Sequence, residues 1–369
     1  MERSASDWLA EGDAHYDARR WNEAGIAFER TLALDGAQAH AWYRLGNVRE
    51  ELGRDADAAQ CFERAVALDP AHAQAWNNLG GARQRLGDPE AAAGAYVRSI
   101  EADSRLAQPR LNLGRLYTSQ GRHALAADCF RAGLAQHPED PTFAHLAAAA
   151  IGESTARAPQ GYVTALFDRI APQFEQHLVR DLGYRVPEAL VERVRPALED
   201  WRRKALPVRV VDLGCGTGLI GAALAGSGAE VVGVDLSPRM LEIAAARGAY
   251  VRLEQGELVE VLLRSAPASV QAVLAADVFI YVGDLEATFR AVARALAPGG
   301  LFAFSVEALA EGDYRLLPSG RYAQSPAYLR ELGAAAGLAE RLLERAPIRR
   351  EGAGYAEGWL ALFARPASG

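Results

Sequence analysis

A short run of glycines and acidic residues in the second half of the chain has the spacing of a nucleotide-binding loop. The run 212–218 reads Asp-Leu-Gly-Cys-Gly-Thr-Gly after an apolar stretch, and Asp235 follows about 20 residues later at the end of another. Glycine lets the backbone approach a ligand with no side chain in between. A carboxylate at the second position can accept both hydroxyl groups of a ribose. These residues predict a site for a ribose-containing ligand.

The same glycines also fit the dinucleotide pattern GxGxxG by letter, at 216–221. This fit is weak, because the carboxylate of Asp212 precedes the glycines and would face a pyrophosphate. S-adenosylmethionine has no pyrophosphate, and its amino acid group carries an ammonium that requires acidic or carbonyl acceptors. The acidic loop therefore favours S-adenosylmethionine over a nicotinamide dinucleotide.

Alternating strand and helix patterns surround this loop and predict an α/β domain with a mostly parallel sheet. Pro187 opens a predicted helix at 186–198. The last predicted strand can return antiparallel to the strand at 301–306. The predicted strands are 208–213, 230–236, 272–275 and 301–306, a weaker one at 250–253, and two at the end of the chain, 341–348 and 358–364.

The second half resembles the class I S-adenosylmethionine-dependent methyltransferases, whose Rossmann-like fold we expect over 161–369 after a linker at 151–160. The motifs that carry the resemblance stand in order at 212–218, at Asp235 with the following Ser-Pro, at 277–281 and at 297–300. The resemblance implies S-adenosylmethionine as cofactor and places Glu257 and Leu258 in the loop that contacts adenine. The residues expected around the cofactor are Asp212, Gly214, Cys215, Gly216, Gly218, Asp235, Leu236, Met240, Glu257, Leu258 and Asp277.

Methyl transfer is an in-line displacement, in which the enzyme mainly aligns the two reactants and excludes water. A general base helps when the acceptor is a hydroxyl or a protonated amine. Asp277 is expected either to bind the methionine ammonium or to cap its strand. His177 is either a base or a hydrogen-bonded structural histidine. The candidate bases are His177, Tyr281 and Glu307, and the candidate acceptor contacts are Phe279, Tyr281, Arg321 and Tyr322.

A more specific resemblance is to bacterial chains that join tetratricopeptide repeats directly to such a domain. Those chains share an Arg-Tyr-Ala-His-Ser pattern, and this sequence has Gln324 where they have histidine, at 321–325. The substitution puts a proton-transfer role for that position in doubt. The resemblance names no acceptor.

The first half of the chain repeats with a period of 34 residues. This period resembles the tetratricopeptide repeat, a pair of antiparallel helices, and predicts an all-helical solenoid over 1–150. Four repeats are expected at about 5–38, 39–72, 73–106 and 107–140, with a capping helix at about 142–150. Small residues such as Gly46 are expected where two helices cross closely, and large ones such as Phe62 are expected to fill the space between neighbouring helix pairs. The repeated columns are Trp8, Trp42 and Trp76; Gly12, Gly46, Gly80 and Gly114; Ala24, Ala58, Ala92 and Ala126; and Phe28, Phe62, Tyr96 and Phe130.

Such a solenoid has a concave groove that can hold an extended peptide. The alternatives are that the groove residues are solvated or serve the second domain. The candidate groove residues are Tyr43, Asn47, Asn77, Asn78, Gln84, Asn112 and Arg115. Three functions stay open: methylation of a protein or peptide held by the groove, methylation of a small molecule with the repeats used for assembly, and a non-catalytic scaffold that binds the cofactor.

Composition narrows the class of partner. The formal net charge of −7 over 369 residues disfavours a general nucleic-acid binder. Three cysteines without metal-ligand spacing predict no metal site and a reducing compartment. No stretch reaches the length of a membrane span or a signal peptide, so we expect a cytoplasmic protein without membrane contact.

Overall fold

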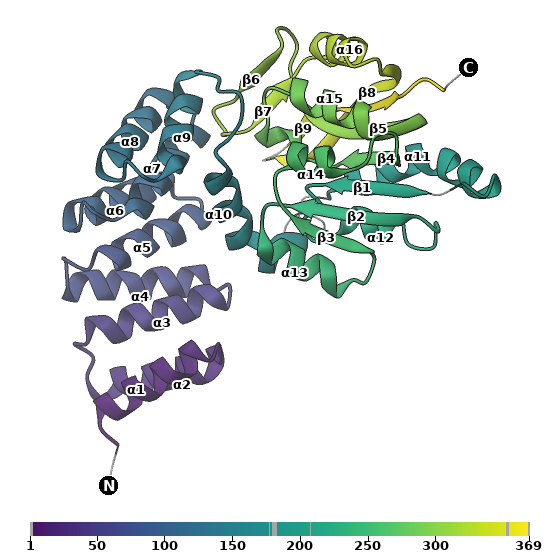
Figure 1. The fold of residues 1–369 in the computed structure, drawn as a ribbon. Coiled ribbons are helices and arrows are strands. Elements are labelled where there is room, and N and C mark those ends of the chain that lie inside the picture. The colour runs from purple at the N-terminus through teal and green to yellow at the C-terminus, as the bar shows by residue number, and fades with distance from the viewer. Residues whose placement is uncertain (1–2, 177, 179–182, 207, 352–353, 368–369) are drawn as a thin grey trace. The chain divides into compact units, whose positions relative to one another are not determined.

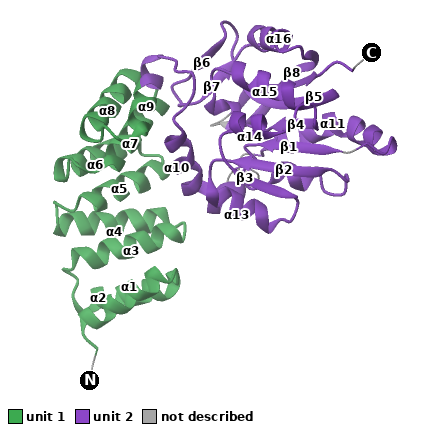
Figure 2. Ribbon diagram, viewed as in Figure 1, with its two compact units in different colours: residues 1–147 green, residues 148–369 purple. Residues whose placement is uncertain are grey.

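The computed structural model describes residues 3–176, 178, 183–206, 208–351 and 354–367. The chain divides into two compact units, residues 1–147 and 148–369, and the division falls inside one helix (Figure 2). The predicted start of the catalytic domain at 161 therefore lies 13 residues inside the second unit. Within the described part of the chain, no helix combines the length and the apolar character needed to cross a membrane.

The first unit consists of helix pairs, as the 34-residue period predicts (Figure 1). Each repeat places a glycine of its first helix against an aromatic ring of its second. A Cβ atom added to Gly12, Gly46, Gly80 or Gly114 would lie 2.4–2.5 Å from a ring carbon of the aromatic residue 16 positions later. The expected close crossing of the two helices is therefore confirmed. The helices are α1 Ala5–Asp17, α2 Trp21–Leu34, α3 Ala39–Glu51, α4 Asp55–Leu68, α5 Ala73–Arg85, α6 Pro89–Ala102, α7 Ala107–Ser119, α8 His123–Gln136 and α9 Pro141–Ile151.

The second unit is built on one sheet with the strand order β3-β2-β1-β4-β5-β7-β6. Strands β1 to β5 run parallel, with Val211 of β1 opposite Val232 of β2 and Val273 of β4. β9 pairs antiparallel with β5, as predicted, and β8 pairs with β9. The strands are β1 Arg209–Leu213, β2 Glu230–Asp235, β3 Arg252–Gln255, β4 Val270–Ala275, β5 Leu296–Ala308, β6 Tyr314–Leu316, β7 Tyr322–Gln324, β8 Ala339–Glu351 and β9 Gly354–Ala364.

Helices cover both faces of this sheet and bury apolar side chains against it. Residues of α11 and α12 pack on one face, and residues of α14, α15 and α16 pack on the other. Because neighbouring parallel strands end at the same edge, the loops after β1, β2 and β4 meet there. The helices are α10 Gln160–Ile170, α11 Val186–Arg203, α12 Leu219–Ala223, α13 Pro238–Ala246, α14 Leu258–Arg264, α15 Glu286–Ala295 and α16 Pro326–Ala335, with short 3-10 helices η1 Ala171–Gln173 and η3 Phe279–Tyr281.

The short strands β6 and β7 were not predicted. They have three residues each, and β7 extends the sheet beside the end of β5. Three residues are too few to show the alternation of apolar and polar positions from which strands are predicted.

Candidate functional site

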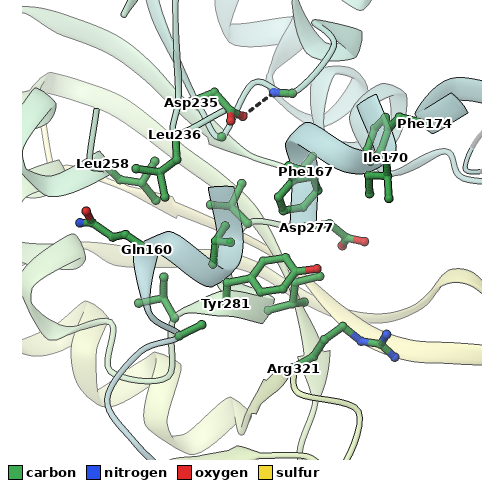
Figure 3. A pocket seen from close by; sticks show the side chains of 18 of the residues that line it. Gln160, Phe167, Ile170, Phe174, Asp235, Leu236, Leu258, Asp277, Tyr281 and Arg321 are labelled. Atoms are coloured by element: carbon green, nitrogen blue, oxygen red, sulfur yellow. Dashed lines mark hydrogen bonds between the residues drawn. The ribbon is translucent and has the colours of Figure 1, made fainter. Parts of the chain in front are cut away.

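A pocket opens in the second unit where the loops after β1, β2 and β4 meet (Figure 3). Its cavity volume is about 230 Å³. Leu236, Leu258 and Gln160 lie toward one end, and Asp277 and Arg321 lie toward the other. Between these ends the wall is formed by loop backbone on one side and by helix α10 on the other.

The glycine loop after β1 presents backbone to this pocket. Gly214 and Gly216 line it, and both have positive φ angles, +62° and +53°. A Cβ atom on Gly214 would lie 2.5 Å from the side chain of Val278, so this position accepts only glycine. The loop can therefore approach a ligand closely.

Asp235 ends β2 directly beside that loop. One carboxylate oxygen accepts a hydrogen bond of 2.8 Å from the Gly216 N–H, and the other accepts one of 2.8 Å from the Ser237 N–H (Figure 3). Burial raises the pKa of Asp235, and these backbone donors oppose the rise. Each oxygen keeps a second lone pair, so the carboxylate can also accept hydroxyl groups from a ligand.

Leu236 and Leu258 make one end of the pocket apolar, and the acidic residue Glu257 lies beside them. Glu257 caps α14, because its carboxylate accepts hydrogen bonds from the N–H groups of Val259 and Glu260. Its other oxygen lies 3.4 Å from a terminal nitrogen of Arg157. This end therefore combines apolar side chains with a carboxylate and a guanidinium.

Arg157 belongs to a segment that was expected to be a linker. Residues 154–158 of this segment, which we call the strap, instead hydrogen-bond to the loops of the second unit. The Ala156 carbonyl accepts from the N–H groups of Gly283 and Asp284 at 2.9 and 2.8 Å, and the Ala158 N–H donates to the Tyr281 carbonyl at 3.0 Å. The strap is therefore part of the pocket wall.

Helix α10 covers the pocket with an apolar face. Val163, Phe167 and Ile170 line it, and the Phe167 ring meets the Tyr281 ring edge-on at 5.4 Å between centroids. Asp168 on the same helix accepts a 2.6 Å hydrogen bond from the Ser237 hydroxyl after β2. This bond ties the cover to the strand that carries Asp235.

A charged network closes the opposite end of the pocket. Arg349 on β8 donates to Asp277 at 3.0 Å and to Glu307. Glu307 also accepts from Nε of Arg321 at 2.6 Å. Asp277, Arg321 and Arg349 line the pocket, whereas Glu307 does not. Asp277 has a φ of +54°, and Ser305 and Arg349 both bond its carboxylate.

Four residues predicted to surround the cofactor do not line the pocket: Asp212, Cys215, Gly218 and Met240. The carboxylate of Asp212 is buried behind the glycine loop and accepts a 2.7 Å hydrogen bond from the Tyr250 hydroxyl. Met240 belongs to α13 and is fully buried, and Cys215 is 6% exposed. Asp212, Cys215 and Met240 are therefore buried in the core of the second unit and are not open to the pocket.

Three residues predicted for the acceptor side do not line the pocket. Phe279 is fully buried and packs its ring against Phe302 and Phe304 of β5. Tyr322 is also fully buried, with its hydroxyl paired to Thr155 of the strap. Glu307 accepts hydrogen bonds from both Arg321 and Arg349 and is 5% exposed.

Among the other predicted residues, Tyr281 and Arg321 line the pocket, and His177 lies outside the described residues. Burial raises the pKa of Tyr281 well above its ordinary value, so its hydroxyl is protonated near neutral pH. Gln324, which replaces the histidine of the resembling chains, donates to the carbonyls of Phe279 and Val282 and supports η3 from below.

Three residues that line the pocket were not predicted from the sequence: Arg157, Gln160 and Arg349. Arg349 comes from β8, 72 residues after its partner Asp277, and nothing in its local sequence signals a site. Arg157 and Gln160 fell in the expected linker, whose small residues, Pro159 and Gly161 indicated a loop.

The first unit carries a second polar feature, a row of asparagine amides along the first helices of repeats two to four. Asn78 donates to Asn47 at 2.9 Å, Asn77 donates to Asn78 at 3.1 Å, and Asn112 donates to Asn77 at 3.0 Å. The predicted groove residues Tyr43 and Gln84 instead contact aromatic side chains of the repeat packing. The amides are thus ordered by one another.

Family models match both halves of the chain. A methyltransferase domain matches residues 210–300, and tetratricopeptide repeats match residues 39–72, 56–107 and 82–141.

Curated relatives match the second half. A ubiquinone biosynthesis O-methyltransferase of Xylella fastidiosa (strain 9a5c) is 33% identical over 176 residues, which cover 40% of this chain and 70% of the relative. One of Xanthomonas campestris pv. campestris (strain B100) is 34% identical over 153 residues, covering 37% and 64%. Among solved structures, the [4+2]-cyclase SpnF aligns at 20% identity over 59% of this chain and 99% of that one, with a TM-score of 0.45.

Proposed function

This chain belongs to the class I S-adenosylmethionine-dependent methyltransferases that carry tetratricopeptide repeats, and on that premise we propose that the pocket of its second unit binds S-adenosylmethionine beside an acceptor and methylates an acceptor oxygen. The proposal rests chiefly on the bond between Asp235 and the Gly216 N–H at the wall of this pocket. The relatives are named O-methyltransferases, which supports oxygen as the acceptor atom.

The residues of the pocket fit the cofactor. Gly214 and Gly216 offer close backbone approach, Asp235 offers a carboxylate for the ribose hydroxyls, and Leu258 offers an apolar surface beside Glu257 for the base. When bound, S-adenosylmethionine supplies an electrophilic methyl group on a sulfonium sulfur. Asp277 stands at the other end of the pocket, where it can accept a hydrogen bond from the methionine ammonium.

The chain contributes alignment and exclusion of water. α10 and Tyr281 enclose the reaction space with aromatic and branched side chains. The carboxylates of Asp277 and Glu307 are each bonded by arginine, and the Tyr281 hydroxyl keeps its proton. The described residues of the wall therefore favour an acceptor with an acidic hydroxyl, such as a phenol, which loses its proton without a strong base.

Calorimetry of S-adenosylhomocysteine binding tests the cofactor site. We expect Asp235→Ala to weaken binding at least about tenfold, because two ribose hydrogen bonds are lost. Asp313→Ala, at an exposed aspartate outside the pocket, is the matched control and should bind like the parent chain. Equal affinity of the two variants would refute the assignment of Asp235, and absence of binding to the parent chain would refute the cofactor site.

A second candidate acceptor is a protein or peptide recruited by the repeats, and the row of asparagine amides favours it. The bonds within the row leave each asparagine amide at least one N–H donor and one acceptor lone pair. The backbone of an extended peptide can therefore hydrogen-bond along the row. Transfer of radiolabelled methyl in a fractionated lysate separates the two. The peptide acceptor is supported if a protein band is labelled and the double variant Asn78→Ala with Asn112→Ala loses that label. The first proposal is supported if label appears only in the small-molecule fraction.

A further inference from the structure

We propose that Gln160, the first residue of helix α10, hydrogen-bonds the 6-amino group of adenine and determines which base the cofactor pocket accepts. The inference rests on the proposed function, since it assigns a residue to the base end of the same cofactor. It goes beyond that function because the resemblance places the contact with adenine in the loop of Glu257 and Leu258, on the other side of the sequence motifs.

The carboxylate of Glu257 is already engaged within the protein. Its Oε2 accepts hydrogen bonds from the N–H groups of Val259 and Glu260 at 2.9 and 3.1 Å, which caps α14 and fixes the direction of the side chain. Its Oε1 lies 3.4 Å from Nη1 of Arg157. A base that bound Glu257 through its amino group would therefore share an oxygen with a guanidinium.

Gln160 offers an amide that the protein does not use. It lines the pocket and lies toward the same end as Leu236 and Leu258 (Figure 3). Arg157, three residues earlier, pairs with Glu257 at this end. Within the described part of the chain, the Gln160 amide makes no hydrogen bond. Its two N–H donors and its acceptor oxygen are thus available to a ligand.

The backbone that carries Gln160 is anchored on both sides. The Ala158 N–H donates to the Tyr281 carbonyl at 3.0 Å, and Ala158 is 3% exposed. Pro159 is the N-cap residue of α10, and its carbonyl accepts a 3.1 Å hydrogen bond from the Val163 N–H. Since the proline ring also restricts φ, little backbone freedom is left at this point. An ordered backbone lowers the entropic cost of binding through the amide.

A glutamine amide matches one edge of adenine. Its oxygen can accept a hydrogen bond from the 6-amino group while its nitrogen donates to N7. Leu236 and Leu258 can pack on the ring, but their side chains have no polar atom that distinguishes one purine from another. Apolar contacts select weakly between ligands of similar shape, whereas a hydrogen-bonding group rejects a ligand that lacks its partner. The selectivity for adenine is therefore expected to depend on Gln160.

Calorimetry with two ligands tests this role. The ligands are S-adenosylhomocysteine and its analogue with hydrogen in place of the 6-amino group. We expect the parent chain to bind S-adenosylhomocysteine about three- to tenfold more tightly than the analogue, because one hydrogen bond is lost. Gln160→Leu should bind the two ligands equally. Gln160→Glu should keep the preference, since a carboxylate still accepts from the amino group.

Gln173→Leu is the matched control. Gln173 belongs to η1, is exposed and does not line the pocket, so this variant should keep the preference of the parent chain. Thermal unfolding shows whether Gln160→Leu is folded, and Gln160→Ala repeats the test if it is not.

Two results would overturn the proposal. The first is that the parent chain binds both ligands equally. The second is that Gln160→Leu keeps the preference, and in that case its loss in Glu257→Gln would assign the amino group to the loop after β3. Failure of the parent chain to bind S-adenosylhomocysteine would instead refute the proposed function itself.

Discussion

The two units of this chain use close side-chain contacts in different ways. In the first unit one contact, a glycine against an aromatic ring 16 residues later, occurs four times, in Gly12–Phe28, Gly46–Phe62, Gly80–Tyr96 and Gly114–Phe130. In the second unit the network at the pocket occurs once and joins residues 14, 42 and 72 positions apart. A repeated local contact is visible in the sequence, and a change at one copy leaves three intact. A single long-range network is not visible in the sequence as a repeat, and no second copy remains when it is broken.

The largest expected effect follows from breaking the single network. Arg349→Met leaves Asp277 and Glu307 with fewer partners while both stay buried. We expect the free energy of unfolding of the second unit to fall by about 3–5 kcal/mol, because an uncompensated buried charge is costly. Denaturant titration followed by tryptophan fluorescence and circular dichroism measures it.

Arg345→Met is the matched control on the same strand. Arg345 pairs with Glu357, but its side chain is 63% exposed, so we expect a loss below about 1 kcal/mol. Similar losses for the two variants would show that the pocket network is no more important to stability than a surface ion pair.

A smaller effect is expected from breaking one copy of the repeated contact. Gly46→Ala would place a Cβ atom 2.5 Å from the Phe62 ring, so the two helices must move apart. We expect the first unit to lose about 1–3 kcal/mol of its free energy of unfolding, since overpacking costs this much in cores. The transition of the second unit should not change.

Gly94→Ala distinguishes a packing effect from an effect of glycine in helices. Gly94 lies inside α6, and an added Cβ atom would meet nothing within 4 Å. Alanine should stabilise this helix by about 0.5–1 kcal/mol. If Gly46→Ala is equally stabilising, the close crossing does not limit the repeat.

The smallest expected effect concerns the buried acid behind the glycine loop. Burial raises the pKa of Asp212 to about 8 from its ordinary value of 3.8. Between these values the folded chain holds a proton that the unfolded chain has released, so stability falls as pH rises through this range. We expect the second unit to lose at least about 1 kcal/mol between pH 6 and pH 8 through this group.

Asp212→Asn should flatten that pH dependence, and Asp313→Asn, at an exposed position, should leave it unchanged. Unfolding curves at several pH values measure the difference. An equally steep decline in Asp212→Asn would mean that another group causes it.

The contrast between the units also explains what the sequence could predict. Gly46 and Phe62 recur at a fixed period, and the strands that precede Gly214 and Asp235 have strong apolar patterns. Both folds, and the meeting of Gly214 and Asp235 at one pocket, were therefore predictable. Phe279 and Tyr322 were predicted at the acceptor site because their motifs point there, but the side to which an aromatic side chain turns depends on packing. Arg349 could not be found, because its position opposite Asp277 is set by the pairing of β8 with β9 and of β9 with β5.

The strap affects how the catalytic unit can be separated from the repeats. A fragment that begins at residue 161, the predicted start of the catalytic domain, would lack Arg157. It would also lack the hydrogen-bond partners of the Gly283 and Asp284 N–H groups and of the Tyr322 hydroxyl. The boundary for recombination or for expression of the enzyme alone therefore lies before residue 148, ahead of the strap. As an exchangeable module, the catalytic unit includes the end of helix α9 and the segment that follows it.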